Sequence, residues 1–287
     1  MYKTSGKSVS SNRMAAALRA QPKTDQYQFG PWTFTAVKGH ILKSEGADRQ
    51  QFESSLALPQ VPEMVFADNV LRVQHEHGFG FEFNPLDALK RVDAEHDLMK
   101  VAGSDAWLKA RSDSEHIHHV VRPFDWTFST DYTGTLLGSD AVPILVSENA
   151  ERIDIEKLKV KEKILFYADV LLYEDELADN GCSSLNVKIR VMPSGFFVLQ
   201  RFYMRVDDVI IRVNDTRVYH EFGNTFCLRE YASRESTFAE LMVPPHLYTD
   251  PNEISAYLKL KHERIERMDL PIILDLPVSM ATENMVE

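Results

Sequence analysis

The stretch IIRVNDTRVYHE contains the side chains of this sequence that are best suited to chemistry. Asn214, Asp215 and Thr216 lie between two arginines, and His220 and Glu221 follow them. Two carboxylates and an imidazole could act as general acid and base in a hydrolase. No nucleophile motif, phosphate-binding loop or zinc-protease motif accompanies them. We therefore expect no enzyme activity and no catalytic residues, and a hydrolase is the least favoured interpretation.

A glycosylation acceptor, a salt-bridged core and a partner-binding surface would also explain this stretch. The triplet at 214–216 matches the glycosylation sequon, but that motif requires a secreted chain. The N-terminal residues have no uninterrupted apolar core of signal-peptide length, and no segment is long enough to span a bilayer. Cys182 and Cys227 cannot form a disulfide framework, which is typical of reduced thiols in an intracellular protein. We expect a cytoplasmic protein, also found in the nucleus, and a chance match to the sequon.

The formal charge of -11 argues against general affinity for nucleic acid or anionic membranes. We expect no cofactor and no designed metal site. His75 and His77 should lie on one strand face, and the sequence HIHH at 116–119 offers three more imidazoles. Neither group has a convincing third and fourth ligand elsewhere, so only adventitious zinc affinity is expected.

Three segments divide the chain. Residues 1–25 are polar and aperiodic and are predicted to be a disordered extension, and residues 277–287 are predicted to be a flexible tail. Between them, residues 26–276 contain no linker and no repeat, so a single domain is expected.

The order of elements within 26–276 predicts an α+β fold around one central antiparallel sheet. Residues 27–43 and 64–83 are expected to form strands. In NPLDALKRV, Asn84 suits an N-cap, Pro85 the first helical position and Asp87 the third. From Asp154, EKLKVKEKILFYADVLLYEDEL has leucines at helical spacing and predicts a long amphipathic helix.

Residues 184–221 alternate with period two and predict three antiparallel strands. Two-residue turns at 193–194 and 207–208 would join them. TFCLREYA predicts a fourth strand, followed by a short helix capped by Ser233. This register predicts an apolar face that holds Val213 and ends in a polar rim at Gln200, Asp215 and Arg217.

The opposite face of these strands would then collect five cations and no carboxylate. One interpretation is salt bridging to acidic helices and loops. The other is a basic, aromatic-lined cleft that binds an anionic peptide. The candidate cleft residues are Lys188, Arg190, Arg201, Tyr203, Arg205 and Arg212.

The loop VRPFDWTFSTDYTGTLLG, residues 121–138, is rich in aromatic and acidic side chains. It could be a packed loop with buried Trp126, or an exposed surface whose aromatic side chains anchor a partner. The sequence leaves both interpretations open.

Several long motifs carry a resemblance to a known family. In order they are VPEMVFADNVLRVQHEHGFGFEFNPLDALKRV, RPFDWTFSTDYTGTLLG, SSLNVKIRVMPSGFF, RVNDTRVYHE and LREYASRES. Together they resemble the TOR signalling pathway regulator-like (TIPRL) family, over roughly residues 29–258.

The resemblance implies a non-catalytic regulator of type 2A protein phosphatases. Such a protein would bind and inhibit the catalytic subunit, hold its C-terminal tail in a cleft, and act in TOR signalling and phosphatase biogenesis or recycling. It also implies a sheet core with an N-terminal α/β region and helices on one surface and the peptide-binding cleft on the other.

The family's partner-binding positions correspond to Asp87, Ile153, Val213 and Asp215. The family more usually has methionine where this chain has Val213, so this contact would differ. Asp215 could instead have a structural role, pairing with Arg217 or Arg229. A general peptide-binding adaptor is the remaining alternative to a phosphatase regulator.

Overall fold

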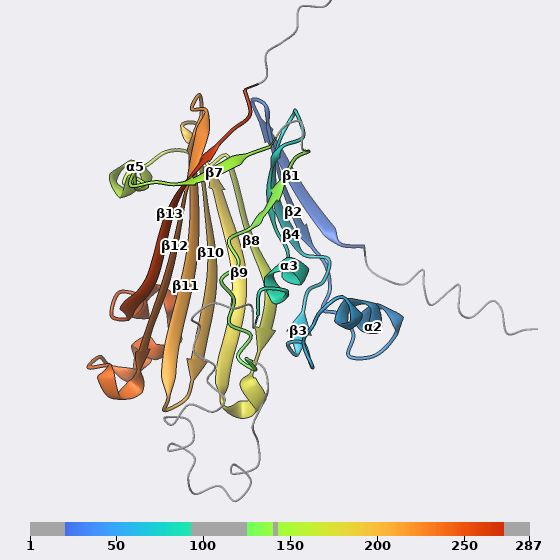
Figure 1. Ribbon diagram of the computed structural model, residues 1–287, viewed down its shortest axis with the longest axis vertical. Helices are drawn as coiled ribbons and strands as arrows, with labels where there is room; N and C mark the ends of the chain where they lie inside the picture. The colour runs from blue at the N-terminus through green and yellow to red at the C-terminus, as the bar shows by residue number, and fades with distance from the viewer. Residues whose placement is uncertain (1–20, 93–124, 140–142, 273–287) are drawn as a thin grey trace, which may run out of the picture.

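Antiparallel strands make up most of the computed structural model, which describes residues 21–92, 125–139 and 143–272. They form two sheets that face each other (Figure 1). The smaller sheet has the strand order β1-β2-β4-β5-β6. Its strands are β1 (Lys23–Phe29), β2 (Trp32–Lys38), β4 (Val70–His75), β5 (Gly80–Phe83) and β6 (Thr135–Leu137).

The larger sheet has eight strands in the order β3-β8-β9-β10-β11-β12-β13-β7. Its strands are β3 (Met64–Val65), β7 (Leu145–Glu148), β8 (Phe166–Asp175), β9 (Gly181–Val191), β10 (Gly195–Val206), β11 (Ile210–Glu221), β12 (Phe226–Thr237) and β13 (Lys259–Asp269).

The helices of the described residues are short, and none is long and apolar enough to cross a membrane. They are α2 (Ala47–Ser54), α3 (Pro85–Leu89), α5 (Ile155–Lys159), α6 (Pro251–Ile254) and the 3-10 turns η2 (Leu177–Asp179), η3 (Phe238–Glu240) and η4 (Pro245–Thr249).

The main core lies between the two sheets. We call the side of the larger sheet that packs on the smaller sheet its inner face, and the opposite side its outer face. Phe34 on β2 packs edge-on against Phe196 on β10, with 5.4 Å between the ring centroids. Alternate residues of β9, such as Val187 and Ile189, also point into this core and are fully or almost fully buried. Period-two alternation therefore indicated the buried side of this strand correctly.

Residues 125–134, which we call the strap, have no regular structure and pass between the sheets (Figure 1). Trp126, Phe128 and Tyr132 are buried in the main core. Tyr132 contacts both sheets, because its hydroxyl donates to the Glu82 carbonyl while its own carbonyl accepts from Gln200. The packed-loop interpretation is thus confirmed for the described part of this loop.

The prediction of one domain built on antiparallel strands is correct, and the prediction of a single central sheet is wrong. One domain dominated by antiparallel strands is present, with few helices. The first helix signal is also confirmed: Asn84 caps α3 by accepting from the Asp87 N–H at 2.8 Å, and Pro85 opens the helix. The N-terminal region forms the second sheet because its strands alternate buried and exposed side chains, as β2 does.

The long helix predicted from Asp154 is wrong. Only Ile155–Lys159 is helical, and Phe166–Asp175 is a strand paired with β9. The apolar residues of this segment also alternate with period two: Val170 and Leu172 are both fully buried. This short apolar run fits both helical spacing and period two. Pairing with the long strand β9 decides for a strand.

The predicted turns of the meander had different outcomes. The two-residue turn at 193–194 is present: Met192 and Gly195 exchange both backbone hydrogen bonds. A Cβ at Gly195 would lie 2.2 Å from the His220 carbonyl oxygen, so this position requires glycine. The second turn has three residues, 207–209, and pairs Val206 with Ile210. Asp208 accommodates it with a left-handed φ of 63°, which aspartate tolerates better than most residues.

The fourth strand is present but longer than predicted, and the helix after it starts later. β12 continues through Ser233, which pairs with Asn214 on β11. Thr237 caps η3 instead, in a capping box with Glu240. Because β12 stays paired with β11 beyond Ser233, its backbone N–H and C=O groups keep their hydrogen bonds, which a helix starting at Ser233 would have broken.

Candidate functional site

The three-residue turn at 207–209 moves every side chain of β11 to the face opposite the predicted one. Arg212, Asn214 and Thr216 point inward, beside Phe202 and Met204 of β10. Val213 and Asp215 point outward, beside Arg201 and Tyr203. The prediction that Val213 and Asp215 share a face holds, but that face is the outer one.

The inward polar side chains of β11 hold the strap at successive points. Arg212 donates from Nη1 to the Ser129 hydroxyl at 2.7 Å, and Asn214 donates from Nδ2 to the Thr130 carbonyl at 3.0 Å. Thr216 donates to the Tyr132 carbonyl at 3.4 Å. An irregular segment buried between two sheets needs such partners for its backbone groups. The inward side chains of Arg212, Asn214 and Thr216 therefore hold the strap in place by hydrogen bonds. We call these three contacts the strap clamp.

Arg212 is the largest side chain that is fully buried. Its guanidinium bonds to Glu235 on β12, with Nε to Oε2 at 2.9 Å and Nη2 to Oε2 at 2.8 Å. Because Arg212 lies on the inner face, it cannot belong to a cleft formed by Arg201 and Arg205. Its assignment to the basic cleft is wrong, since the predicted register was one residue out.

The outward half of β11 forms a salt-bridged cluster. Asp215 is 1% exposed and accepts from both Arg201 Nε, at 2.6 Å, and Arg201 Nη2, at 2.7 Å. Arg217 Nη2 lies 3.3 Å from the same carboxylate. Arg201 also donates to the Asn252 side chain of α6 at 2.8 Å. This bidentate geometry fixes the carboxylate between two guanidinium groups.

The remaining candidate cleft residues are also partnered within the chain. Lys188 pairs with Asp169 at 3.1 Å, and Arg205 pairs with Asp207 at 2.6 Å. The outer face thus carries carboxylates among its cations, and the expectation of a purely cationic face is wrong. The other two cleft residues bond to backbone carbonyls: Arg190 to Leu158, and the Tyr203 hydroxyl to Tyr248.

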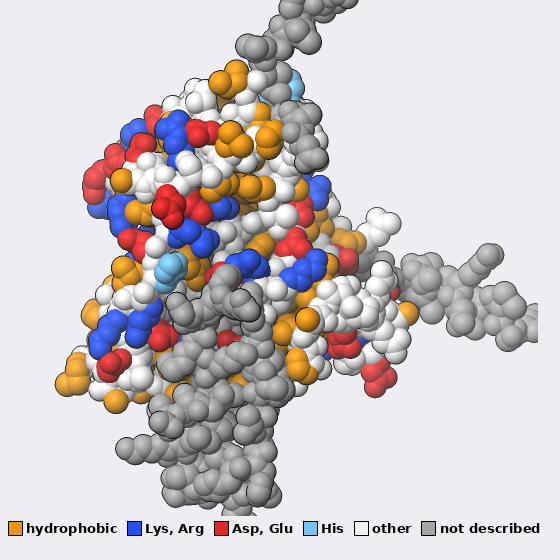
Figure 2. Space-filling view, in the orientation of Figure 1, with side chains coloured by type: hydrophobic (Ala, Val, Ile, Leu, Met, Phe, Trp, Pro, Cys, Tyr) orange, Lys and Arg blue, Asp and Glu red, His pale blue; other side chains and the backbone are white. Residues whose placement is uncertain are grey.

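The visible side of the surface shows the same mixture. Blue and red side chains lie close together there, without a broad area of one sign (Figure 2). Salt bridges therefore account for Arg201, Arg205 and Lys188, but only Arg205 pairs with a loop carboxylate, while the partners of Arg201 and Lys188 lie on strands.

Two apolar clusters cover the ends of the outer face. Val213 is fully buried in the first, with Tyr203, and is covered by Leu241 and Ile254 from the segments after β12. Val213 thus lies on a buried apolar face, as predicted, but this is the outer face and segments of the same chain cover it.

Ile153 is 3% exposed and belongs to the second cluster, with Tyr219 and Leu228. Its backbone N–H donates to Glu230 at 2.8 Å. The segments that cover the two clusters, including α5 and α6, lie on the side of the larger sheet away from the smaller one (Figure 1).

Asp87 lies in α3, beside β6 of the smaller sheet. Its carboxylate accepts from the Thr135 hydroxyl at 2.7 Å, from Asn84 at 3.0 Å and from Lys90 at 3.2 Å. Burial works to raise the pKa of Asp87, but these hydrogen bonds outweigh burial and hold its pKa below the usual value. Of the four predicted partner-binding residues, the structure brings Ile153, Val213 and Asp215 onto one sheet face, while Asp87 lies in α3 beside the smaller sheet.

The residues of the hydrolase alternative are not brought together. Asp215 points outward and His220 inward, because the two lie five positions apart on one strand and side chains alternate between its faces. Glu221 pairs with Lys157 at 2.6 Å. The sequon is equally unsuited to modification, since Asn214 is buried and bonded to the strap.

The histidine groups give no metal centre among the residues that the structure describes. The rings of His75 and His77 are stacked, with centroids 5.1 Å apart. HIHH lies outside the described residues, as do positions 1–20 of the predicted N-terminal extension and the whole predicted tail, 277–287. Both cysteines are free thiols.

The strap clamp was missed by the sequence analysis. Its signal is present in hindsight: Arg212, Asn214 and Thr216 alternate with period two, next to Gln200 on β10. Polar residues at period two on a strand that is otherwise apolar indicate buried backbone groups to be satisfied.

Comparisons with known proteins show which family this sequence resembles. The family model described as TIP41-like family matches residues 64–242. The TIP41-like protein of Homo sapiens is 52% identical over 248 residues, which cover 86% of this chain and 90% of the relative. That of Dictyostelium discoideum is 43% identical over 255 residues, covering 84% and 91%.

A relative from Saccharomyces cerevisiae has a functional name. It is the type 2A phosphatase activator TIP41, 36% identical over 231 residues, which cover 75% of this chain and 64% of the relative. The resemblance recognised in the sequence is confirmed by these similarities. This chain belongs to the TIP41-like family.

Proposed function

We propose that this protein is a non-catalytic cytoplasmic regulator that binds the catalytic subunits of type 2A protein phosphatases. The observation that carries the proposal is its similarity to the Saccharomyces cerevisiae protein named type 2A phosphatase activator TIP41. The separation of Asp215 from His220 on opposite sheet faces supports the non-catalytic part. A role in TOR signalling and in phosphatase biogenesis or recycling belongs to the same proposal.

The outer face is the surface we propose for the partner's C-terminal tail. Arg212 is excluded from it by burial, which leaves Arg217 as the cation best placed to bind a tail carboxylate. Among the described residues, Arg217 has only the 3.3 Å contact to Asp215, and its side chain is 31% exposed. A guanidinium has five N–H donors, so donors remain for a second carboxylate.

The sign of the effect on phosphatase activity is part of the proposal. We propose inhibition, by covering the active site while the tail is held. The relatives from Schizosaccharomyces pombe and Saccharomyces cerevisiae are both named activators. Inhibition and activation predict opposite changes in the activity of an isolated catalytic subunit.

The experiment is calorimetric binding to a type 2A catalytic subunit, intact and without its C-terminal tail, with phosphatase activity measured in parallel. Arg217→Ala is compared with Arg72→Ala, which removes one partly exposed arginine from the smaller sheet. We expect wild-type binding to inhibit, and tail removal and Arg217→Ala each to weaken binding about tenfold, a loss of about 1.4 kcal/mol. Arg72→Ala should bind like the wild type.

Each other outcome rejects a defined part. Binding without any change in activity identifies a peptide-binding adaptor, and activation reverses the proposed sign. Equal binding of intact and truncated subunits rejects tail capture. Absence of binding rejects the phosphatase proposal, and substrate turnover that is lost in His220→Ala would identify an enzyme.

A further inference from the structure

A pocket at one end of the two sheets is not used by the proposed function. It has a volume of 410 Å³ and lies where the β1–β2, β4–β5 and β11–β12 turns meet the end of β13. It is built on inner-face residues, whereas the phosphatase proposal concerns the outer face.

The walls of this pocket are aromatic and uncharged. Trp32 and Phe79 are buried and packed edge-on, with centroids 6.0 Å apart. Phe29 and Phe222 stack at 4.8 Å on another side. Among the described lining residues there is no lysine, arginine, aspartate or glutamate. The pocket therefore fits an uncharged ring better than an ionic group.

His220 contributes a hydrogen-bond acceptor to this apolar site. Its side chain is 2% exposed, and its Nδ1 lies 2.8 Å from the Phe226 carbonyl oxygen. A carbonyl only accepts, so Nδ1 carries the proton and Nε2 holds a lone pair. Burial lowers the pKa of His220 despite this bond, which keeps the ring neutral at pH 7. Within the described part of the chain Nε2 has no hydrogen-bond partner, and it is not fully sealed from solvent.

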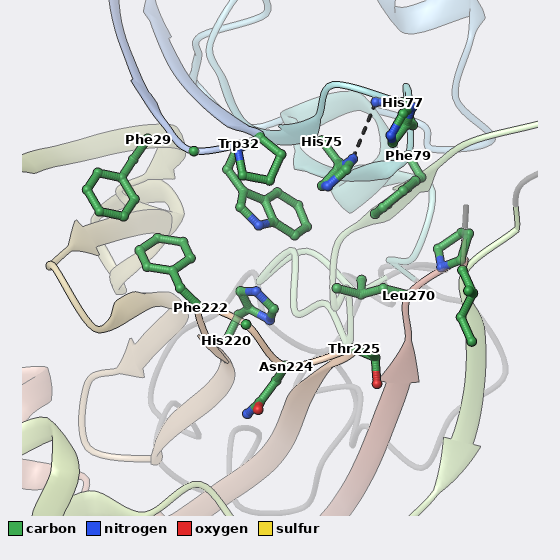
Figure 3. Close-up of a pocket in the computed structure, with 15 residues that line it drawn as sticks. Phe29, Trp32, His75, His77, Phe79, His220, Phe222, Asn224, Thr225 and Leu270 are labelled. Carbon is green, nitrogen blue, oxygen red and sulfur yellow. Dashed lines mark hydrogen bonds between the residues drawn. The ribbon is translucent and has the colours of Figure 1, made fainter. Parts of the chain in front are cut away.

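Trp32 contributes a donor. The residue is 3% exposed, but its indole N–H is not fully sealed from solvent and has no hydrogen-bond partner in residues 21–92, 125–139 and 143–272. The Trp32 and His220 rings are 5.2 Å apart and inclined at 60°. Figure 3 shows the nitrogen edge of the Trp32 indole turned toward His220 across the pocket.

An unpaired donor and an unpaired acceptor in an aromatic pocket define the ligand. A ligand that enters the pocket displaces solvent from both atoms, so it binds well only if it replaces both hydrogen bonds. A phenolic hydroxyl can accept from an indole N–H and donate to an imidazole nitrogen at once. We propose that this pocket binds a phenol, as the side chain of a tyrosine in a partner protein.

The proposal explains why the pocket combines rings with two polar atoms. A phenylalanine side chain would fill the apolar walls but leave the Trp32 donor and the His220 acceptor unpaired. Sites built to bond a hydroxyl reject analogues that lack it, for this reason. The pocket should therefore discriminate phenol from phenyl, whichever protein supplies the side chain.

The test uses the full chain and two small probes, N-acetyl-tyrosinamide and N-acetyl-phenylalaninamide. The chain has three tryptophans, so ¹H–¹⁵N spectra contain three indole N–H signals, which single Trp→Phe variants assign. We expect the tyrosine probe to shift the Trp32 signal in a saturable manner. The phenylalanine probe should bind at least tenfold more weakly.

Two variants separate binding from folding. Asn224→Trp changes an exposed residue at the mouth of the pocket and should block the tyrosine probe while the melting temperature stays unchanged. His220→Phe removes the acceptor but keeps a ring, and should bring the affinities of the two probes within threefold of each other.

Several results would overturn the proposal. They are a Trp32 signal that neither probe moves, equal affinity for both probes in the wild type, and undiminished tyrosine binding in Asn224→Trp. None of these results depends on a phosphatase, so failure here is distinguishable from failure of the regulator proposal.

Discussion

The two faces of β11 both carry charged and polar residues, but these residues have different roles on each face. On the inner face, Arg212 and Asn214 are enclosed between two sheets and hold the strap. On the outer face, Asp215 is enclosed by arginines whose side chains are 11% and 31% exposed. Arg212 and Asn214 are fully or almost fully buried, whereas Arg217 on the outer face is partly exposed. This difference makes the inner face a matter of stability and leaves the outer face open to exchange partners.

The inner face should respond most strongly to mutation. Arg212→Leu puts an apolar side chain in place of the buried guanidinium and leaves Glu235 only the half-exposed Lys261, 3.6 Å away. We expect the free energy of unfolding to fall by about 3–5 kcal/mol, as for other broken buried ion pairs. Urea denaturation followed by circular dichroism measures it.

Two further variants sharpen this prediction. Arg205→Leu removes an outer-face arginine whose partner, Asp207, is 47% exposed, and should cost less than about 1 kcal/mol. The double variant Arg212→Leu/Glu235→Leu should regain part of the loss, because no buried charge remains unpaired. Equal effects of Arg212→Leu and Arg205→Leu would contradict the distinction between the faces.

The centre of the outer face should show an intermediate effect. Asp215→Asn preserves shape and removes the charge that holds Arg201 and Arg217. We expect a loss of about 2 kcal/mol in the free energy of unfolding, since these hydrogen bonds are charge-assisted but partly hydrated. Chemical denaturation and phosphatase binding should be measured on the same preparation.

That pair of measurements separates structure from recognition at Asp215. A structural role lowers stability and leaves the affinity of the folded fraction unchanged. Weakened binding with no change in stability would make Asp215 a recognition residue, and the comparison of faces would then need revision. Asp169→Asn, at the edge of the same face, is the matched control.

The smallest effect is expected at that edge. Lys188 and Asp169 are 41% and 40% exposed, so their 3.1 Å pair is well hydrated. Lys188→Ala should change the free energy of unfolding by less than about 0.5 kcal/mol, and added salt should remove even this difference. A loss above 1 kcal/mol that persists at high salt would show that the outer face is as tightly enclosed as the inner one.

Local signals predicted much of the fold. The cap at Asn84, the two-residue turn before Gly195 and the strands on either side of it required only neighbouring residues. The family followed from long motifs in order. The segment at 166–175 was mistaken for a helix because its apolar residues satisfy both periods, and only β9 at its side decides for a strand.

The candidate site was harder to predict than the fold. A single additional residue in the turn at 207–209 exchanged the faces of Arg212 and Val213, since side chains alternate with period two. The strap's contact with β11 joins residues more than eighty positions apart, such as Thr130 and Asn214. No local pattern contains such a pairing. The pocket between Trp32 and His220 also depends on two sheets meeting.

The sequence by itself determined the antiparallel strands of residues 184–221, the family and the presence of polar residues at period two in β11. The tertiary structure alone decided which of those residues face the strap, which face the outer surface, and which cations keep an open donor. The physical reason is that a strand's pattern records alternation but not which side becomes buried. Burial is settled when a distant segment packs on one face, and the cost of unpaired buried groups then fixes every partner.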